Sequence, residues 1–259
     1  MTMVNVVKIG GNVINDPAAL SQFLDKFVRI KGPKVLVHGG GREATVIAKA
    51  LGIETVMIEG RRVTDARTLE VVTMVYAGLI NKRIVAALQV RGCNAMGLSG
   101  ADGALIRSKR RPAEPYDFGF VGDLTADSVD AGLLRSLVSQ GLTPVICAIT
   151  YGGDGQLLNT NADSVATAVA QSLAHNGGST LTFCFEMPGV MADIERADSV
   201  ISDITPADFA ILKETGVVSG GMVPKLQGAL NAVAEGVKAV KITHHSLLDN
   251  PSAGTTIHL

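Results

Sequence analysis

The chain has 259 residues, of which 47% are hydrophobic and 18% charged. This composition supports a sizeable core and excludes an intrinsically disordered chain. Aromatic residues make up only 4% and Trp is absent, which argues against a base-stacking surface for single-stranded nucleic acid. The net charge of −1, from 23 basic and 24 acidic residues, provides no global field for nucleic acid or membrane. An anionic substrate must therefore meet positive charge that is gathered locally.

Cysteine usage and the N-terminus predict a cytoplasmic protein. Cys93, Cys147 and Cys184 are widely spaced, form no CxxC pair and lie in or beside apolar runs, which favours reduced, buried thiols. The chain begins almost directly with a strand-like run at residues 4–7, without the pattern of a signal peptide. We expect no uninterrupted apolar segment long enough to span a bilayer.

Short apolar runs alternate with helical patterns along the chain. The runs are nearly continuously apolar, which is typical of strands buried on both faces of a parallel sheet. The order predicts an α/β fold, a three-layer α/β/α sandwich with a mostly parallel central sheet. The predicted strands are residues 4–9, 34–37, 55–58, 94–98, 143–149, 180–185 and 239–243, and the predicted helices are 17–30, one from 41, 65–89, 128–141, one from 161 or 163 to 174, one from 206, and 224–235.

Residues 106–124 break this alternation and predict an antiparallel hairpin with a loop, attached to the N-terminal half. Within it, the basic run Lys109-Arg110-Arg111 is interpreted as a solvated loop. A loop near residues 173–179 is the best candidate for a boundary between two lobes of one continuous fold, 1–175 and 176–259. We expect the first lobe to hold the substrate and the second the nucleotide base.

Two strand ends lead into glycines. Lys8 closes the first strand and is followed by Gly10 and Gly11, and the second strand runs through His38 into residues 39–41 and then a helical pattern. Glycines allow backbone N–H groups to face an anion closely, and a helix start behind them adds its dipole. Ligands bind at the carboxyl edge of parallel strands, so both loops are expected to face one ligand. His38 is interpreted as a packed, hydrogen-bonded histidine.

Three further patterns suggest ligand contacts. One arginine of Arg61-Arg62, just before a predicted helix cap, can grip a carboxylate through two hydrogen bonds. A helix cap needs only one polar side chain, and three occur here: Asn159, Asn161 and Asp163. The others are available for ligand contacts, and Asp163 is a natural partner for lysines. Lys225 follows two glycines at a helix start, where a cation is mildly unfavourable, which favours a phosphate contact.

Five motifs occur together in a characteristic order: KIGG at 8–11, VHGGG at 37–41, GRRVT at 60–64, LLNTNAD at 157–163 and GGMVPK at 220–225. Residues 97–103 and 118–123 fit the same pattern. On these motifs the chain resembles the amino acid kinase family and, within it, the N-acetyl-L-glutamate kinases of arginine biosynthesis. The resemblance covers nearly the whole chain, and the combination is specific although no single motif is.

The resemblance implies phosphorylation of the side-chain carboxylate of N-acetyl-L-glutamate by ATP, with Mg²⁺ held mainly through the ATP phosphates and no dedicated protein metal ligands. It also implies an open α/β/α sandwich and a homodimer built partly on the long helix after Asp65. The implied catalytic residues are Lys8, Lys225 and Asp163, with Asp163 holding both lysines. The implied substrate contacts are Gly39, Gly40, Gly41, Arg62 and Asn159, and the implied nucleotide contacts are Lys8, Gly10, Gly11, Glu186, Gly189, Gly221 and Lys225.

Two departures from the family pattern stand out. The nucleotide-side loop at 184–190 carries Glu186 and Pro188 where the family has a T-D-x-x-G-like run, so the adenine-contacting residues stay open. Arginine-inhibited hexameric members have an extra N-terminal helix, and we expect this chain to form an arginine-insensitive dimer.

The acceptor carboxylate has a reference pKa of about 4.3 and is ionised at neutral pH, so it needs no general base. The obstacle is repulsion between two anions, about 4 kcal/mol for unit charges 4 Å apart at an effective dielectric of 20. Fixed cations and amides must offset a term of that size.

Several alternatives remain open at this level. The acceptor could be N-succinyl-L-glutamate, aspartate, carbamate or a nucleoside monophosphate, although the pairing of Arg62 with Asn159 favours an acylated amino acid. A non-catalytic ligand-binding regulator is opposed by the retention of Lys8, Lys225 and Asp163. A dinucleotide-dependent dehydrogenase is weakened because GxGxxG is missing.

Overall fold

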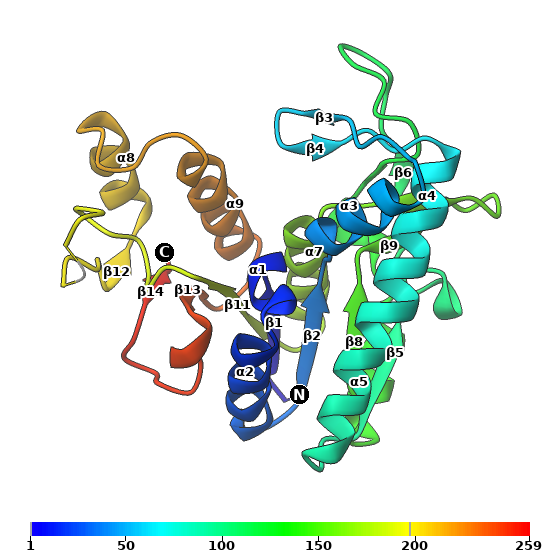
Figure 1. Cartoon of the computed structure of the whole chain (residues 1–259). Coiled ribbons are helices and arrows are strands. Elements are labelled where there is room, and N and C mark those ends of the chain that lie inside the picture. The colour runs from blue at the N-terminus through cyan, green and yellow to red at the C-terminus, as the bar shows by residue number, and fades with distance from the viewer. Residues whose placement is uncertain (1, 197) are drawn as a thin grey trace.

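An eight-stranded sheet runs through the whole molecule (Figure 1). The structure is a computed structural model that describes residues 2–196 and 198–259. The strand order is β12-β14-β13-β11-β1-β2-β8-β5, and every neighbouring pair is parallel except β13 and β14. The predicted mostly parallel sheet is confirmed. Its strands are β1 (Val4–Ile9), β2 (Lys34–His38), β5 (Ala95–Leu98), β8 (Thr143–Cys147), β11 (Ser179–Phe185), β12 (Asp203–Ile204), β13 (Val240–His244) and β14 (Thr255–Ile257).

Helices cover both faces of the sheet and complete the predicted three-layer sandwich. One hydrophobic core joins the sheet to α6, α7, α8 and α9, and a second joins the opposite face to α1, α2, α3 and the long helix formed by α4, η1 and α5. The bounds are α1 (Gly11–Asn15), α2 (Pro17–Arg29), α3 (Gly41–Ala50), α4 (Ala66–Thr73), η1 (Met74–Ile80), α5 (Asn81–Val90), α6 (Ala131–Ser139), α7 (Ala162–His175), α8 (Pro206–Glu214) and α9 (Met222–Ala234).

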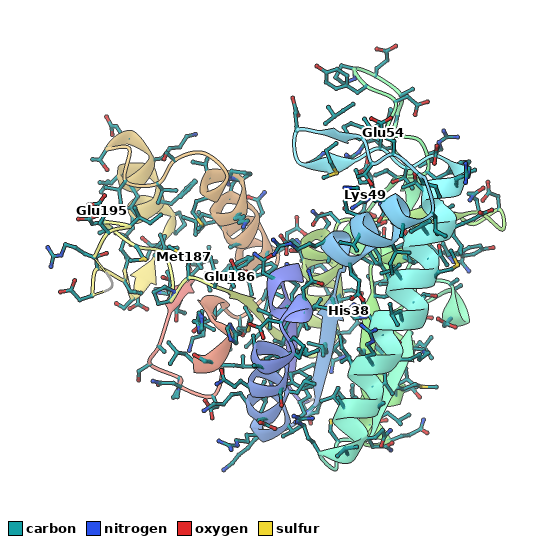
Figure 2. All side chains as sticks on the ribbon, viewed as in Figure 1. His38, Lys49, Glu54, Glu186, Met187 and Glu195 are labelled. Atoms are coloured by element: carbon teal, nitrogen blue, oxygen red, sulfur yellow. The ribbon has the colours of Figure 1, made fainter. Side chains whose placement is uncertain are left out.

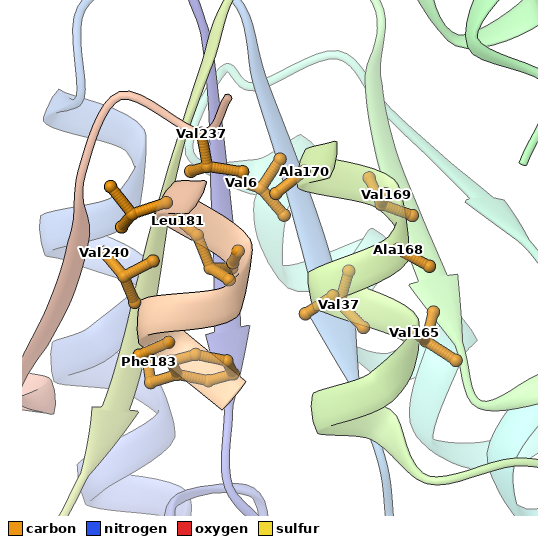
Figure 3. Packing of buried hydrophobic residues seen from close by; sticks show 14 of the residues in the cluster. Val6, Val37, Val165, Ala168, Val169, Ala170, Leu181, Phe183, Val237 and Val240 are labelled. Carbon is orange, nitrogen blue, oxygen red and sulfur yellow. The ribbon is translucent and has the colours of Figure 1, made fainter. Parts of the chain in front are cut away.

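Side chains alternate along each strand, so successive residues enter opposite hydrophobic cores. On β1, Val4 and Val6 enter the core under α7 and α9, whereas Val7 and Ile9 enter the opposite core. Figure 3 shows Val6 and Leu181 packed beside the α7 residues of the first core. Because successive side chains point to opposite faces, Lys8 lies on the α7 face. His38 at the end of β2 lies on the other face, where it contacts Asn81 of α5.

The predicted strand at residues 55–58 is wrong as a member of the central sheet. Only Met57–Ile58 (β3) is extended, and it pairs antiparallel with Arg61–Arg62 (β4) in a separate hairpin. Glu59 and Gly60 form the turn, both with positive φ. Met57 is 50% exposed, so this apolar run is not a core strand, a distinction that composition alone does not make.

Other differences concern short elements. The predicted strand at 143–149 divides into β8 and β9 (Ile149–Tyr151), and β9 pairs antiparallel with β10 (Leu157–Asn159). β12, β14 and α1 were not predicted, since two to five residues give no clear period. The hairpin predicted within 106–124 is confirmed by the antiparallel pair β6 (Lys109–Arg110) and β7 (Gly122–Asp123).

Helix caps follow the predicted chemistry with one shift. The side chains of Asp65, Asn161 and Thr205 accept hydrogen bonds from the first-turn amides of α4, α7 and α8. The helix predicted from Ser128 begins at Ala131, because Asp130 caps it and residues 126–128 form a separate 3₁₀ turn. These caps satisfy amides that would otherwise lack partners.

The long helix from Ala66 to Val90 contains a π-helical segment, η1. Among the described residues it is the one helix whose length and composition would also suit a membrane span. Arg67, Glu70, Lys82 and Arg83 lie within it, so it is not an uninterrupted apolar segment. Its inward face, including Val72, Ile80 and Ile84, is buried against the sheet. A core helix of a soluble fold has the same length and composition, so this property assigns no membrane role. The division into lobes 1–175 and 176–259 stays a prediction, because β11 and β1 pair within one continuous sheet.

Candidate functional site

The predicted site residues gather at the carboxyl ends of β1, β2 and β11. Lys8 is Cα-paired with Val37 of β2 and Phe183 of β11, which brings the ends of the three strands together. The residues that follow are the Gly10-Gly11 turn, the Gly39–41 loop at the start of α3, and Glu186. Figure 2 labels His38 beside β2, and Glu186 with Met187 on the side of the molecule that carries α8 and α9. This edge is where the fold class binds its ligands.

Lys8 is buried at the centre of this edge. It is only 7% exposed, and its Nζ lies 2.7 Å from Oδ1 of Asp163, in the first turn of α7. A buried ammonium without such a partner would be strongly destabilising, so the ion pair with Asp163 compensates the buried charge and fixes its position. The predicted partnership of these two residues is present in the structure.

Lys225, in the first turn of α9, is held differently. No carboxylate of the described residues lies within 4 Å of its Nζ, which corrects the expectation that Asp163 holds both lysines. Its Nζ lies instead 4.3 Å from the centroid of the Phe185 ring, and the Nζ of Lys8 lies 5.3 Å from the same centroid. Both lysines line one cavity of about 510 Å³, together with Gly10, Gly11 and Glu186.

A second cavity, of about 270 Å³, adjoins Lys8 on the other side. Its lining contains four cations (Lys8, Arg61, Arg62 and Arg111) and no Asp or Glu. The Gly39–41 loop, Asn159 and Tyr76 complete the wall. A cavity with this charge favours an anion.

Arg62 is buried in that wall and ties three segments together. Its Nη2 donates to the carbonyl oxygen of Gly41 and to Oγ1 of Thr45, both at 2.8 Å, and its Nη1 donates to Oγ1 of Thr55 at 3.1 Å. Three of the five guanidinium N–H groups are thereby used. Among the described residues no carboxylate pairs with Arg62, so a buried cation is left for an anionic ligand.

Asn159 belongs to the same wall through a network that starts at Thr64. The Asn159 side chain donates to Oγ1 of Thr64 at 3.0 Å, and the backbone N–H of Thr64 donates to the carbonyl oxygen of Phe118 at 2.9 Å. Gly119 has a φ of 72°, and a Cβ there would lie 2.2 Å from the carbonyl oxygen of Thr64. Only glycine fits this close backbone approach.

His38 supports the glycine loop and faces no ligand cavity. Its Nδ1 lies 2.8 Å from the carbonyl oxygen of Gly39, and its Nε2 lies 3.0 Å from Nδ2 of Asn81. Complete burial lowers the pKa of His38 to about 4, so the ring is neutral, with Nδ1–H donating to Gly39 and Nε2 accepting from Asn81. The prediction of a packed, hydrogen-bonded histidine is confirmed.

Gly40, next to Gly39 in the same loop, is fixed by packing. Gly40 has a φ of 155°, and a Cβ on it would lie 2.3 Å from Cδ1 of Ile80 in η1. The loop therefore presses directly onto the π-helical segment. Tyr76 from the same segment lines the 270 Å³ cavity, and burial raises the pKa of its phenol despite the adjacent Arg62.

Arg111 corrects the prediction of a solvated basic run. Lys109 and Arg110 are exposed, but Arg111 lines the 270 Å³ cavity. Its Nε donates to Oδ1 of Asp123 at 3.1 Å, and its guanidinium lies 5.3 Å from the Phe118 ring centroid. Its Nη1 is buried and has no hydrogen-bond partner among the described residues. Sequence reasoning missed this residue because nothing in a run of three cations marks the one that turns inward.

The structure brings together only some of the residues predicted to contact the nucleotide. Glu186 lines the cavity with both lysines, and Gly221 lines a larger one of about 920 Å³ between α7, β11 and α9. Gly189 lies elsewhere: a Cβ on it would lie 2.7 Å from Cγ1 of Val200, so it serves packing. No group of three or more His, Cys, Asp or Glu suited to a metal occurs in the described residues. Asp163 and Glu186 are the carboxylates that line the 510 Å³ cavity.

Comparison with known proteins identifies the family. The sequence profile described as the Amino acid kinase family matches residues 3–244. The chain belongs to the amino acid kinase family. An acetylglutamate kinase of Bacteroides thetaiotaomicron is 50% identical over 252 residues, 97% of each chain, and one of Cytophaga hutchinsonii is 48% identical over 263 residues, 99% of each. The carbamate kinase from Giardia lamblia bound to AMP-PNP shares the fold, with a TM-score of 0.70 at 16% identity, covering 99% of this chain and 98% of that one.

These findings confirm the resemblance read from the motifs, and this amino acid kinase is a phosphotransferase. The likeness to the carbamate kinase shows the fold alone, since the identity is low.

Proposed function

We propose that this kinase transfers the γ-phosphoryl group of ATP to the side-chain carboxylate of N-acetyl-L-glutamate, giving an acyl phosphate in arginine biosynthesis. The observation that carries the proposal is the position of Lys8, which lines both the 270 Å³ cavity with Arg62 and the 510 Å³ cavity with Lys225. A carboxylate in the first cavity and a triphosphate in the second would meet at its ammonium group. The names of relatives at about half identity support the same reaction.

The proposed roles follow from charge and burial. Lys8 and Lys225 offset the repulsion between the incoming carboxylate and the γ-phosphate, and Asp163 holds Lys8 in place through their ion pair. The backbone N–H groups of Gly11 and of the Gly39–41 loop add donors without adding bulk. The N–H of Gly10 already donates to the carbonyl oxygen of Cys184. Catalysis then consists of positioning and electrostatic stabilisation, as expected for phosphoryl transfer.

Arg62 and Asn159 are proposed to hold the acceptor. Arg62 has no carboxylate partner among the described residues and faces the cavity, which suits the α-carboxylate of an acylated amino acid. Asn159 donates one N–H to Thr64 and keeps a second N–H and its oxygen for the acylamino group. Mg²⁺, held between ATP oxygens, would supply charge neutralisation of the transferring phosphoryl group.

The direct test is to trap the product. With MgATP and N-acetyl-L-glutamate in the presence of hydroxylamine, we expect an acyl hydroxamate to form in step with ADP. Free L-glutamate is the control, since it carries the same side-chain carboxylate but a charged amine. ADP release that is indifferent to the acylated acceptor would overturn the proposal.

A second acceptor, N-succinyl-L-glutamate, is favoured by one observation. Arg111 lines the 270 Å³ cavity, and its Nη1 is buried without a hydrogen-bond partner among the described residues. An unpaired guanidinium N–H favours the binding of an additional oxygen. The two acceptors are separated by comparing kcat/KM for each. If succinyl is used, Arg111→Gln should lower kcat/KM for N-succinyl-L-glutamate while sparing N-acetyl-L-glutamate. An equal loss for both acceptors would remove this candidate.

We propose a cytoplasmic homodimer in which the long helix contributes to the interface. Met74 and Val90 on this helix are 56% and 88% exposed, so an interface on the helix would remove their apolar surface from water. Light scattering after size exclusion would give the mass of two chains. Met74→Lys should shift the mass toward one chain, whereas Val217→Lys, on an exposed apolar residue far from this helix, should not.

A further inference from the structure

Phe185 occupies an unusual place between the two lysines. It ends β11, on the same face of the sheet as Lys8. Its ring centroid lies 4.3 Å from Nζ of Lys225 and 5.3 Å from Nζ of Lys8. Both distances lie within the range at which a cation is attracted by the face of an aromatic ring. The separation of the two ammonium groups cannot exceed the sum of these distances, so one ring serves both.

The ring has a second neighbour that fixes it. Phe183 stacks on Phe185 with centroids 6.1 Å apart and an interplanar angle of 13°. Phe183 is 7% exposed within the core under α7 and α9. The buried ring therefore holds the outer one in a defined orientation at the edge of the cleft.

Lys225 depends on this ring more than Lys8 does. Lys8 has Asp163 at 2.7 Å, whereas no carboxylate of the described residues lies within 4 Å of Lys225. The Lys225 residue is exposed, and a free lysine head explores many rotamers. Among the described contacts, the Phe185 ring is the group that confines its ammonium.

An aromatic ring suits this position for a physical reason. A carboxylate beside Lys225 would also fix it, but would add a negative charge next to the triphosphate and cancel the charge the lysine provides. The ring attracts the ammonium through its quadrupole and carries no net charge. We propose that Phe185 is a positioning residue that holds the ammonium groups of Lys225 and, more weakly, Lys8 toward the nucleotide phosphates. This inference rests on the proposed phosphoryl transfer from ATP.

The test replaces Phe185 by mono-, di- and trifluorinated phenylalanine, which weakens the quadrupole stepwise at almost constant shape. We expect the dissociation constant of MgATP, measured by calorimetry, to rise with each fluorine, reaching about two- to fivefold for the trifluorinated ring. Phe185→Tyr should bind MgATP nearly as the unsubstituted protein does. Phe185→Leu should have a dissociation constant for MgATP similar to that of the trifluorinated form. A ring that merely fills space would give a flat series.

The matched control is the same fluorination at Phe183, which stacks on Phe185 but has no ammonium over its ring among the described residues. At Phe183 the dissociation constant of MgATP should not change with the number of fluorines. An equal rise per fluorine at the two positions would overturn the inference. A readout without ATP separates this inference from the proposed function. In the ligand-free protein, the ring current should shift the Lys225 ε-methylene protons upfield, and Phe185→Leu should abolish that shift. If the shift is absent from the unsubstituted protein, the inference fails whatever the kinase assay shows. If no acyl phosphate forms while the shift and its loss are seen, the proposed function alone fails.

Discussion

Protonation of His38 should cost this fold a large part of its stability in mild acid. The ring is completely buried, and its pKa is lowered from 6.5 to about 4 because burial disfavours the charged form. In the unfolded chain the same ring titrates near 6.5. Between these values the unfolded state binds more protons, so stability is complete above pH 6.5 and is lost as the pH falls toward 4. The contribution lost is about 2 kcal/mol by pH 5 and about 3 kcal/mol by pH 4.

The assay is the free energy of unfolding in urea at several pH values between 4.5 and 7.5. His38→Gln removes the titrating group and should flatten the pH dependence by that amount, even though the variant is less stable at pH 7.5. His258→Gln, at a half-exposed position, should keep the wild-type slope. An unchanged slope in His38→Gln would refute the argument that burial of a neutral His38 supports the Gly39–41 loop.

The other predictions concern the site, the backbone and the thiols. Lys8→Met should lower kcat by about tenfold to a thousandfold, the scale of lost charge stabilisation, and near-normal turnover in steady-state assays would contradict its role. Arg62→Ala should mainly raise KM for the acceptor, whereas a fall in kcat alone would contradict substrate binding. Gly119→Ala should destabilise the fold by at least about 1–2 kcal/mol in urea unfolding, because its φ is 72° and the new Cβ meets a carbonyl oxygen at 2.2 Å; wild-type stability would show that the turn relaxes. Cys147 and Cys184, with thiol pKa values raised to about 12 by burial, should not react with a thiol reagent at pH 8 until the protein unfolds, and reaction in the folded state would contradict that burial.

Much of the fold follows from local patterns. Six of the predicted apolar runs form strands of the central sheet, and they are readable because each is continuously apolar. The helices are readable because they have a clear period and defined caps. Asp65, for example, accepts from the Thr68 N–H as its position before α4 predicts. The short strands β12 and β14 depend on tertiary pairing with β13, which no local pattern encodes.

The site was predictable where backbone chemistry dictates residue type. Glycines after strand ends, and a lysine on the crevice side, are requirements of an anion site, and the structure places Lys8 beside Asp163. Contacts between side chains on opposite sides of the cleft were harder to predict from the sequence. The pairing of Lys225 with Phe185 and the inward turn of Arg111 depend on which face a side chain takes after long-range packing.

The central claim is that Lys8 and Lys225 jointly surround the phosphoryl group as it moves to a carboxylate. A crystal structure with MgADP, aluminium fluoride and N-acetyl-L-glutamate tests it most directly. We expect both ammonium groups to lie within hydrogen-bond distance of the planar fluoride and the side-chain carboxylate to be in line with it. A fluoride contacted by neither lysine, or an acceptor bound outside the cavity that contains Arg62, would contradict it.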